Sequence, residues 1–290
     1  MDTRSDVVSY DDKRADNGNY NDEKKAFQIM ALGIFDSGVG GLTVYKELSS
    51  AFPHTNMFYL GDTARVPYGN KSPETIIRYS MECACLLTDK YHVNALVVAC
   101  NTISSYAVDK LKSVFGLPVL EVIQAGAEKA LQVTCNGAIG VIGTIATIRS
   151  NSYVNMLKEL SGDTVRIWQK ACPLFVPLVE EGLITGDIPR LTIKFYLDEL
   201  MKRPIDTLIL ACTHYPILAP LISELYPQIR IVDSATVMVE KIKQMGILVS
   251  ESGRREILVT DASPAFESLK TMLVGNIRMK VIELRETGIA

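Results

Sequence analysis

The stretch ALVVACNT at residues 95–102 and the stretch TLILACTH at residues 207–214 decide the fold. Each begins with a run of apolar residues and ends in Ala-Cys, followed by polar residues that include a threonine. A short apolar run bounded by polar residues is typical of a buried strand in a parallel sheet. The sequence therefore predicts two buried strands, with Cys100 at the carboxyl end of one and Cys212 at the end of the other.

Apolar runs of this kind occur along most of the chain, and helical patterns such as 41–52, 72–91 and 235–248 separate most of them. Strands that are apolar on both faces and alternate with helices predict an α/β protein with parallel sheets. Ten strands are too many for one compact open sheet in a chain of 290 residues, so we expect two smaller sheets. The predicted strands are 31–36, 56–62, 95–100, 117–122, 138–143, 164–168, 207–212, 229–234, 256–260 and 279–284.

The strand, loop and helix of residues 33–48 are repeated in residues 140–157, and each copy is followed further on by a strand ending in Ala-Cys. We infer two similar parallel-sheet α/β domains related by pseudo-symmetry. Because ligands bind beyond the carboxyl ends of strands in such sheets, we expect the active site in the cleft between the domains. Helical patterns follow both cysteines, at 103–115 and 216–226, and a helix N-terminus is expected to lower the pKa of a thiol.

Composition and charge exclude several classes of protein. A formal charge of −3 and a pI near 5.7 give no general reason to bind nucleic acid or an anionic membrane. The most apolar N-terminal stretch, 24–35, is too short to span a bilayer and lacks a signal cleavage site, so we interpret it as the first strand of a cytoplasmic protein. Residues 1–25 hold seven acidic and five basic residues and few aliphatic ones, which predicts a disordered or loosely docked arm.

Six cysteines without any C-x-x-C pair argue against a zinc ribbon and a thioredoxin-type motif. Three histidines supply few ligands for a zinc site, and we assign no role to His54 or His92. A redox pair formed by Cys100 and Cys212 stays open as an alternative at this point, as does a metal site. Plain packing is the interpretation for the remaining cysteines, which are Cys83, Cys85, Cys135 and Cys172.

Two loops carry weaker signals. The loop DSGVGG at 36–41 has the glycines that allow a close backbone approach to a carboxylate or phosphate, but it matches neither a Walker A motif nor the dinucleotide fingerprint. Its Asp36 either assists a thiol or caps the next helix. The Pro-Tyr-Gly turn within 62–72 presents backbone amides to a ligand or is an ordinary surface loop.

Taken together, five motifs resemble the glutamate racemases, a family of cofactor-independent enzymes that make D-glutamate for bacterial peptidoglycan. The motifs occur in the family's order, and the resemblance extends from about residue 31 to the C-terminus. Aspartate and hydantoin racemases share the plan with two thiols, but PYG together with CTHYP is most similar to the glutamate enzymes. The motifs are FDSGVGGLTV (35–44), GDTARVPYGNKS (61–72), VVACNTIS (97–104), PLVEEG (177–182) and LILACTHYPIL (208–218).

The resemblance implies a two-base reaction without metal or organic cofactor. Cys100 would remove the α-proton of D-glutamate and Cys212 that of L-glutamate. In each direction the other cysteine, as thiol, would donate a proton to the opposite face of the α-carbon. Asp36 would assist Cys100, while Glu180, preferred over Glu181 by family spacing, and His214 would assist Cys212. The positions that match the family's substrate contacts are Ser37, Pro67, Tyr68, Gly69, Asn101, Thr102, Thr144, Thr147 and Thr213.

The resemblance also implies a discontinuous first domain, 29–121 with 234–290, a second domain, 122–233, and an N-terminal arm, 1–28. Some family members with such an arm respond to a peptidoglycan precursor, and members are dimers or monomers, so a homodimer is one expected arrangement. Two alternative functions stay open: a racemase of the same plan acting on aspartate, and a two-thiol redox or metal-binding protein.

Overall fold

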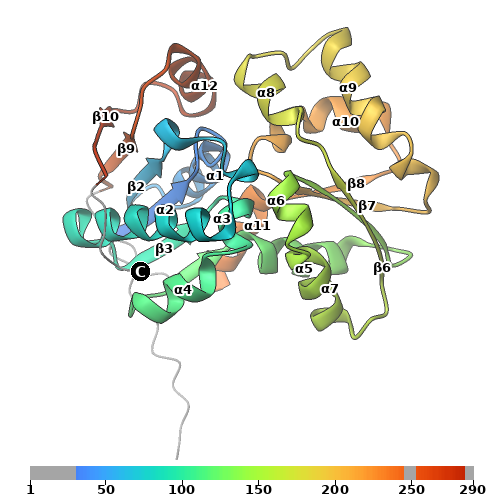
Figure 1. Cartoon of the computed structure of the whole chain (residues 1–290), viewed down its shortest axis with the longest axis horizontal. Helices are drawn as coiled ribbons and strands as arrows, with labels where there is room; N and C mark the ends of the chain where they lie inside the picture. The colour runs from blue at the N-terminus through green and yellow to red at the C-terminus, as the bar shows by residue number, and fades with distance from the viewer. Residues whose placement is uncertain (1–30, 245–252, 285–290) are drawn as a thin grey trace, which may run out of the picture.

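The computed structural model describes residues 31–244 and 253–284, and the predicted N-terminal arm lies outside them. Each of the ten predicted apolar runs forms a strand, and the strands assemble into one sheet of six and one of four (Figure 1). The strands are β1 (Ala31–Asp36), β2 (Asn56–Gly61), β3 (Ala95–Val98), β4 (Val119–Glu121), β5 (Ala138–Gly143), β6 (Arg166–Ala171), β7 (Thr207–Ala211), β8 (Arg230–Asp233), β9 (Arg255–Val259) and β10 (Met279–Val281).

Helices connect the strands and cover the sheets. The α-helices are α1 (Leu42–Ala51), α2 (Pro73–Cys85), α3 (Asn101–Ser104), α4 (Val108–Val114), α5 (Val122–Val133), α6 (Ile145–Arg149), α7 (Ser152–Ser161), α8 (Phe175–Glu180), α9 (Asp187–Leu197), α10 (Ala219–Leu225), α11 (Ser234–Gln244) and α12 (Pro264–Val274). Short 3₁₀ segments are η1 (Thr63–Arg65), η2 (Tyr68–Asn70), η4 (Leu200–Lys202) and η5 (Tyr215–Leu218), and η3 (Leu86–Lys90) is π-helical.

The two sheets share one topology. The strand order is β10-β9-β2-β1-β3-β4 in the first sheet and β6-β5-β7-β8 in the second, and every pairing in the described residues is parallel. The segment β2-β1-β3-β4 therefore has the same order as β6-β5-β7-β8. The prediction of an α/β fold with two similar parallel sheets is confirmed, and the two cysteines follow the equivalent strands β3 and β7.

Both faces of each sheet are buried, as the unbroken apolar runs predict. In β1, Leu32 and Ile34 pack in the core that includes α1 and α11, while Phe35 packs in the core that includes α2. In β7, Leu208 faces the core with α8 to α10, while Ile209 faces the core with α5 and α7. This alternation follows from the two-residue period of a strand.

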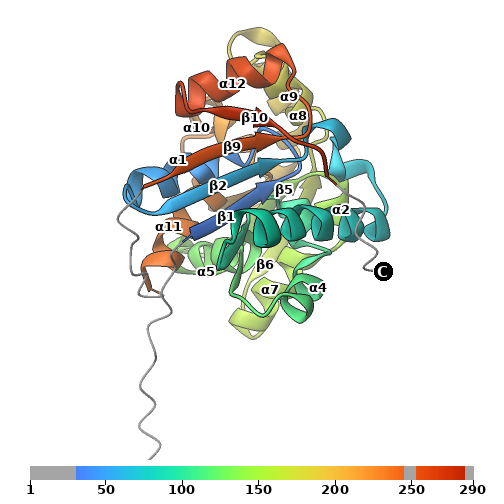
Figure 2. The same cartoon turned by 90° about the vertical axis from the view of Figure 1, so that its left-hand side faces the viewer.

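The C-terminal segment returns to the first sheet. Strand β9 pairs with β2, so Tyr59 lies opposite Ile257, and β10 adds the outermost strand (Figure 2). The domain boundaries given above stay a prediction. No helix in the described residues is long and apolar enough to cross a membrane.

The predicted elements differ from the structure mainly at their ends. The helical pattern 103–115 is divided into α3 and α4, and 216–226 begins as the 3₁₀ segment η5 before α10. The pattern 72–91 is α-helical only as far as Cys85. Strand β3 ends at Val98, which places Cys100 in the loop beyond the strand and directly before α3.

Candidate active site

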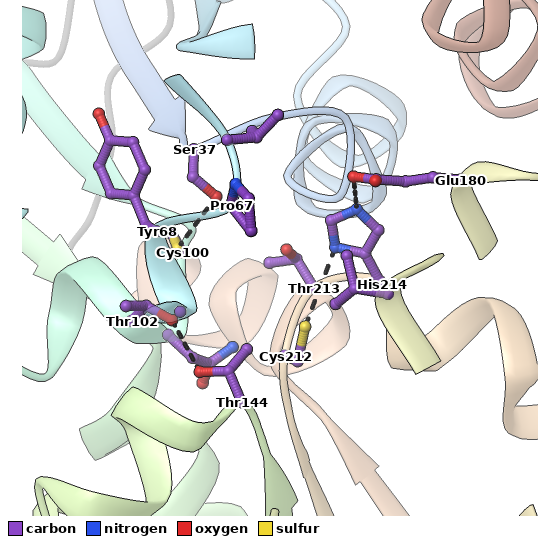
Figure 3. Close-up of a pocket in the computed structure, with 14 residues that line it drawn as sticks. Ser37, Pro67, Tyr68, Cys100, Thr102, Thr144, Glu180, Cys212, Thr213 and His214 are labelled. Atoms are coloured by element: carbon purple, nitrogen blue, oxygen red, sulfur yellow. Dashed lines mark hydrogen bonds and ion pairs between the residues drawn. The ribbon is translucent and has the colours of Figure 1, made fainter. Parts of the chain in front are cut away.

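The carboxyl ends of both sheets contribute to one cavity with an empty volume of about 380 Å³, its mouth included. Both candidate cysteines line it. Figure 3 shows Cys100 beside Ser37 and Tyr68 on one side and Cys212 beside His214 on another. Most of the predicted site residues are brought together here, and the two exceptions are Asp36 and Thr147. The predicted residues in the wall are Ser37, Pro67, Tyr68, Gly69, Cys100, Asn101, Thr102, Thr144, Glu180, Cys212, Thr213 and His214.

Cys100 carries a buried thiol and directly precedes α3. Its Sγ lies 3.7 Å from Ser37 Oγ. Burial, followed by the charge of Asp36, raises the pKa of Cys100 to about 12, although the backbone N–H of Ile103 and the Ser37 hydroxyl act in the opposite direction. The expectation that the helix would lower this pKa is therefore wrong, because α3 has only four residues and cannot offset the desolvation.

Cys212 has a different environment. Its Sγ lies 3.9 Å from His214 Nδ1, and His214 Nε2 lies 3.2 Å from Glu180 Oε1. Burial by itself lowers the pKa of His214, but the contacts with Cys212 and Glu180 outweigh it and raise the pKa to about 10. A cationic imidazole therefore lies next to the Cys212 sulfur at neutral pH.

Asp36 lies at the end of β1 with its carboxylate fully buried. Its Oδ1 accepts from Gly38 N at 2.8 Å, and its Oδ2 accepts from Thr213 Oγ1 at 3.2 Å. Burial raises the pKa of Asp36, while His214 and these donors counteract the shift. The carboxylate therefore acts on Cys100 through its charge, and its hydrogen bond with a side chain joins it to the other half of the molecule.

Three threonine hydroxyls form a closed cluster at the cavity. Thr102 Oγ1 lies 3.1 Å from Thr144 Oγ1 and 3.3 Å from Thr147 Oγ1, and the last two are 3.0 Å apart. Thr102 belongs to the first half of the molecule and the other two to the second. Thr147 is buried behind Thr144, so its contribution to the cavity is indirect. Hydroxyls that bond one another can turn to donate to a carboxylate.

Asn101 supplies a further polar group. Its Oδ1 accepts from Tyr153 OH at 2.7 Å, while its buried Nδ2 has no hydrogen-bond partner among the described residues. A buried amide donor without an acceptor is costly. An acceptor on a bound anion would satisfy it, because Asn101 lines the cavity.

Two apolar wall residues, Val66 and Val176, were missed by the sequence analysis. Val66 lies inside a quoted motif, directly before Pro67. Val176 precedes Glu180 by four residues on α8, so helical spacing places the two side chains on one face and could have identified it.

Neither a cluster of metal-type ligands nor a disulfide occurs in the part of the chain that the structure describes. The described residues contain no group of three or more His, Cys, Asp and Glu side chains arranged to hold a metal ion. All six cysteines are free, Cys100 and Cys212 among them. Plain packing is wrong for Cys135, which is exposed at the loop before β5, whereas Cys83, Cys85 and Cys172 are buried as expected.

Known proteins resemble this chain in sequence and in fold. A sequence model described as Asp/Glu/Hydantoin racemase matches residues 38–242. A glutamate racemase of Sulfurihydrogenibium sp. (strain YO3AOP1) is 57% identical over 257 residues, which cover 89% of this chain and 98% of that protein.

Solved structures with bound ligands are also similar. The glutamate racemase of Francisella tularensis in complex with D-glutamate superimposes with a TM-score of 0.81 at 32% identity, covering 89% of this chain and 98% of that one. The Escherichia coli glutamate racemase in complex with L-glutamate and the activator UDP-MurNAc-ala gives a TM-score of 0.73 at 25% identity, covering 87% and 98%.

Proposed function

This chain belongs to the Asp/Glu/hydantoin racemase family, and from that premise we propose that it interconverts L-glutamate and D-glutamate by proton transfer between Cys100 and Cys212. The observation that carries the proposal is the presence of two free, buried cysteines from equivalent strand ends in the wall of one cavity. D-glutamate made in this way supplies peptidoglycan synthesis, the process in which the family works.

The reaction requires two groups because a stereocentre is inverted only when a proton leaves one face and another arrives at the opposite face. One cysteine, as thiolate, removes the α-proton and becomes a thiol. The carbanion formed at the α-carbon then takes the proton of the other thiol, which becomes the thiolate. The overall charge of the site is unchanged, and the enzyme is left in the form that acts on the opposite enantiomer.

The surroundings of the cysteines favour one resting form. The raised pKa of Cys100 keeps its proton in place, and the positive charge of His214 lies next to the Cys212 sulfur. In this form Cys212 is the base and Cys100 the acid. By the family's stereochemistry the resting form acts on L-glutamate, with Glu180 holding the charge of His214.

The polar wall of the cavity fits an amino acid with two carboxylates. We propose that the Asn101 amide and the threonine hydroxyls bind one carboxylate and that the Tyr68 and Gly69 backbone amides bind the distal one. Glycine is required at position 69, since a Cβ there would lie 2.8 Å from Thr144 Cβ. Glutamate is preferred to aspartate because its length spans these two groups of donors.

We further propose that the protein works in the cytoplasm, either as a homodimer or as a monomer. A peptidoglycan precursor is a candidate effector, because the Escherichia coli relative is in complex with the activator UDP-MurNAc-ala. Rates measured with and without that compound test the effector proposal. Sedimentation at working concentrations distinguishes a homodimer from a monomer.

The experiment that tests the proposed reaction is incubation of the purified protein with L-glutamate in deuterium oxide, without cofactor or metal. D-glutamate with deuterium at the α-carbon is the expected product. The proposal is wrong if no D-glutamate forms, or if a chelator removes the activity and a metal restores it. Faster turnover of aspartate would redirect the proposal to the aspartate enzymes.

A further inference from the structure

The fully buried carboxylate of Asp62 lies next to the cavity without lining it, and the proposed mechanism gives it no part. Three side-chain donors form hydrogen bonds with this carboxylate. Its Oδ2 accepts from Arg65 Nε at 2.6 Å and from the Tyr68 hydroxyl, and its Oδ1 accepts from Thr260 Oγ1 at 2.9 Å. A buried carboxylate is tolerated only with such partners, so these contacts are interdependent.

Arg65 extends this network to α2. Its Nη1 donates to the buried Glu82, and its guanidinium stacks 3.8 Å from the centre of the Tyr79 ring. Burial by itself lowers the pKa of Arg65, but the contacts with Glu82 and Asp62 outweigh burial and raise this pKa above its ordinary value. One cation therefore joins two carboxylates and fixes residues 62–65 against α2.

The C-terminal segment holds the other side of this loop. Thr260 Oγ1 donates to Asp62 and also accepts from Ala64 N at 2.8 Å. Thr63 Oγ1 donates to the Asp261 carbonyl at 2.5 Å and accepts from Asp261 N at 2.8 Å. Residues 260 and 261 directly follow β9, which lies beside β2 in the sheet (Figure 2).

The network ends at the cavity wall. Tyr68 is buried, and Asp62 holds the far end of its ring, so the backbone that continues to Gly69 is fixed in position. We propose that Asp62 is a positioning residue for the Tyr68–Gly69 backbone and that Thr260 completes this arrangement, so that the C-terminal segment sets the affinity for glutamate. The inference rests on the proposed function, because the distal carboxylate of glutamate is the group that these amides bind.

The test compares Thr260→Val with Thr260→Ser. Valine has nearly the same shape but no hydroxyl, so Asp62 loses a donor and the Ala64 amide loses its acceptor, whereas serine keeps both contacts. We expect Thr260→Val to raise KM for both enantiomers by about three- to tenfold with a much smaller change in kcat, since the loop moves and the cysteines do not. Thr260→Ser should have the KM of the wild type.

Binding is measured separately, by calorimetry with D-glutamate, in the inactive background Cys100→Ser/Cys212→Ser. The Kd should rise by a similar factor when Thr260→Val is added. Tyr226→Phe is the control, since it removes another hydroxyl that donates to a carboxylate, the partly buried bond to Asp198 at 2.6 Å, away from the cavity. It should lower the melting temperature without changing KM.

Two results would overturn the inference. Unchanged KM and Kd in Thr260→Val, with only a lower melting temperature, would leave Thr260 a purely structural residue. An equal rise in KM in Thr260→Val and in Thr260→Ser would exclude the loss of the hydroxyl as the cause. If the parent background binds no glutamate at all, the proposed function itself is wrong, and the inference is wrong with it.

Discussion

Thr213 Oγ1 donates a hydrogen bond of 3.2 Å to Asp36 Oδ2, joining residues 177 positions apart in the sequence. The Thr213 carbonyl also accepts from Thr43 Oγ1 at 3.3 Å. Thr213 stands between Cys212 and His214 in the chain, so the end of β1 and the start of α1 hold the acid/base group of the second half in place. The two halves of the site are therefore coupled by direct contact and do not merely face each other.

Gly40 tests this coupling. A Cβ at position 40 would lie 2.3 Å from Thr213 Oγ1 and 2.6 Å from His214 Nδ1, so alanine must displace one or both side chains. We expect Gly40→Ala to lower kcat/KM by about tenfold or more, because small displacements of catalytic groups are costly. The value of kcat/KM must fall by the same factor with L-glutamate and with D-glutamate as substrate, since the equilibrium constant between the enantiomers is unity.

Gly116→Ala is the matched control, because a Cβ at position 116 meets no atom within 4 Å. Its steady-state rates should equal those of the wild type. Wild-type activity in Gly40→Ala would show that the site accepts a displaced Thr213, and the coupling between the halves would then have no catalytic significance.

The pH dependence of the reaction should report His214. Its pKa is raised from 6.5 to about 10, so the cation that faces Cys212 is present through neutral pH and is lost as the pH rises through about 10. Glu180→Gln removes one of the contacts that raise this pKa. The alkaline limb of kcat/KM for L-glutamate should therefore move to lower pH by about one unit, since this ratio reports groups of the free enzyme.

Glu181→Gln provides the control, because Glu181 is the next residue and lines a neighbouring cavity without entering that of the cysteines. Its alkaline limb should coincide with that of the wild type. An unshifted limb in Glu180→Gln would mean that another group is titrated in this range, and the Cys212–His214–Glu180 arrangement would not control the profile.

The fold could be predicted from the sequence because its strands are buried on both faces. Runs such as ALVVAC cannot be placed elsewhere at low cost, and their number required two sheets. The ends of elements were predicted less well. Residues 103–115 have one helical pattern, but the chain turns between α3 and α4, where tertiary packing outweighs local preference.

The membership of the site could also be predicted, since strand ends and motifs mark most of its wall. Its electrostatics could not. A helix after Cys100 suggested a lowered pKa, but the burial of the thiol and its distance from the Asp36 carboxylate arise only when the chain is folded. The contact of Thr213 with Asp36 and that of Thr260 with Asp62 likewise join residues that no local pattern relates.

We expect the cavity to discriminate strongly between glutamate and the shorter aspartate. Aspartate is one methylene shorter than glutamate, so its distal carboxylate cannot reach the Tyr68–Gly69 amides while its α-carbon stays between the cysteines. Buried donors would then be left unpaired, and we expect kcat/KM for aspartate to be lower by about a hundredfold or more. Comparable values for the two amino acids, measured by circular dichroism of each pure enantiomer, would contradict the assignment to glutamate.

Replacement of either cysteine by serine should separate the two halves of the reaction. Because an alcohol is a much weaker base than a thiol, Cys100→Ser and Cys212→Ser should each lower the rate of racemisation by about a thousandfold or more. Each variant keeps one thiol, however, and elimination of HX from a glutamate analogue with a leaving group at the β-carbon requires proton removal from one face only. Cys212→Ser should therefore process the D-configured analogue and Cys100→Ser the L-configured one, as measured by formation of the keto acid. The same stereochemical preference in both variants would show that the two sulfurs do not act on opposite faces of the α-carbon.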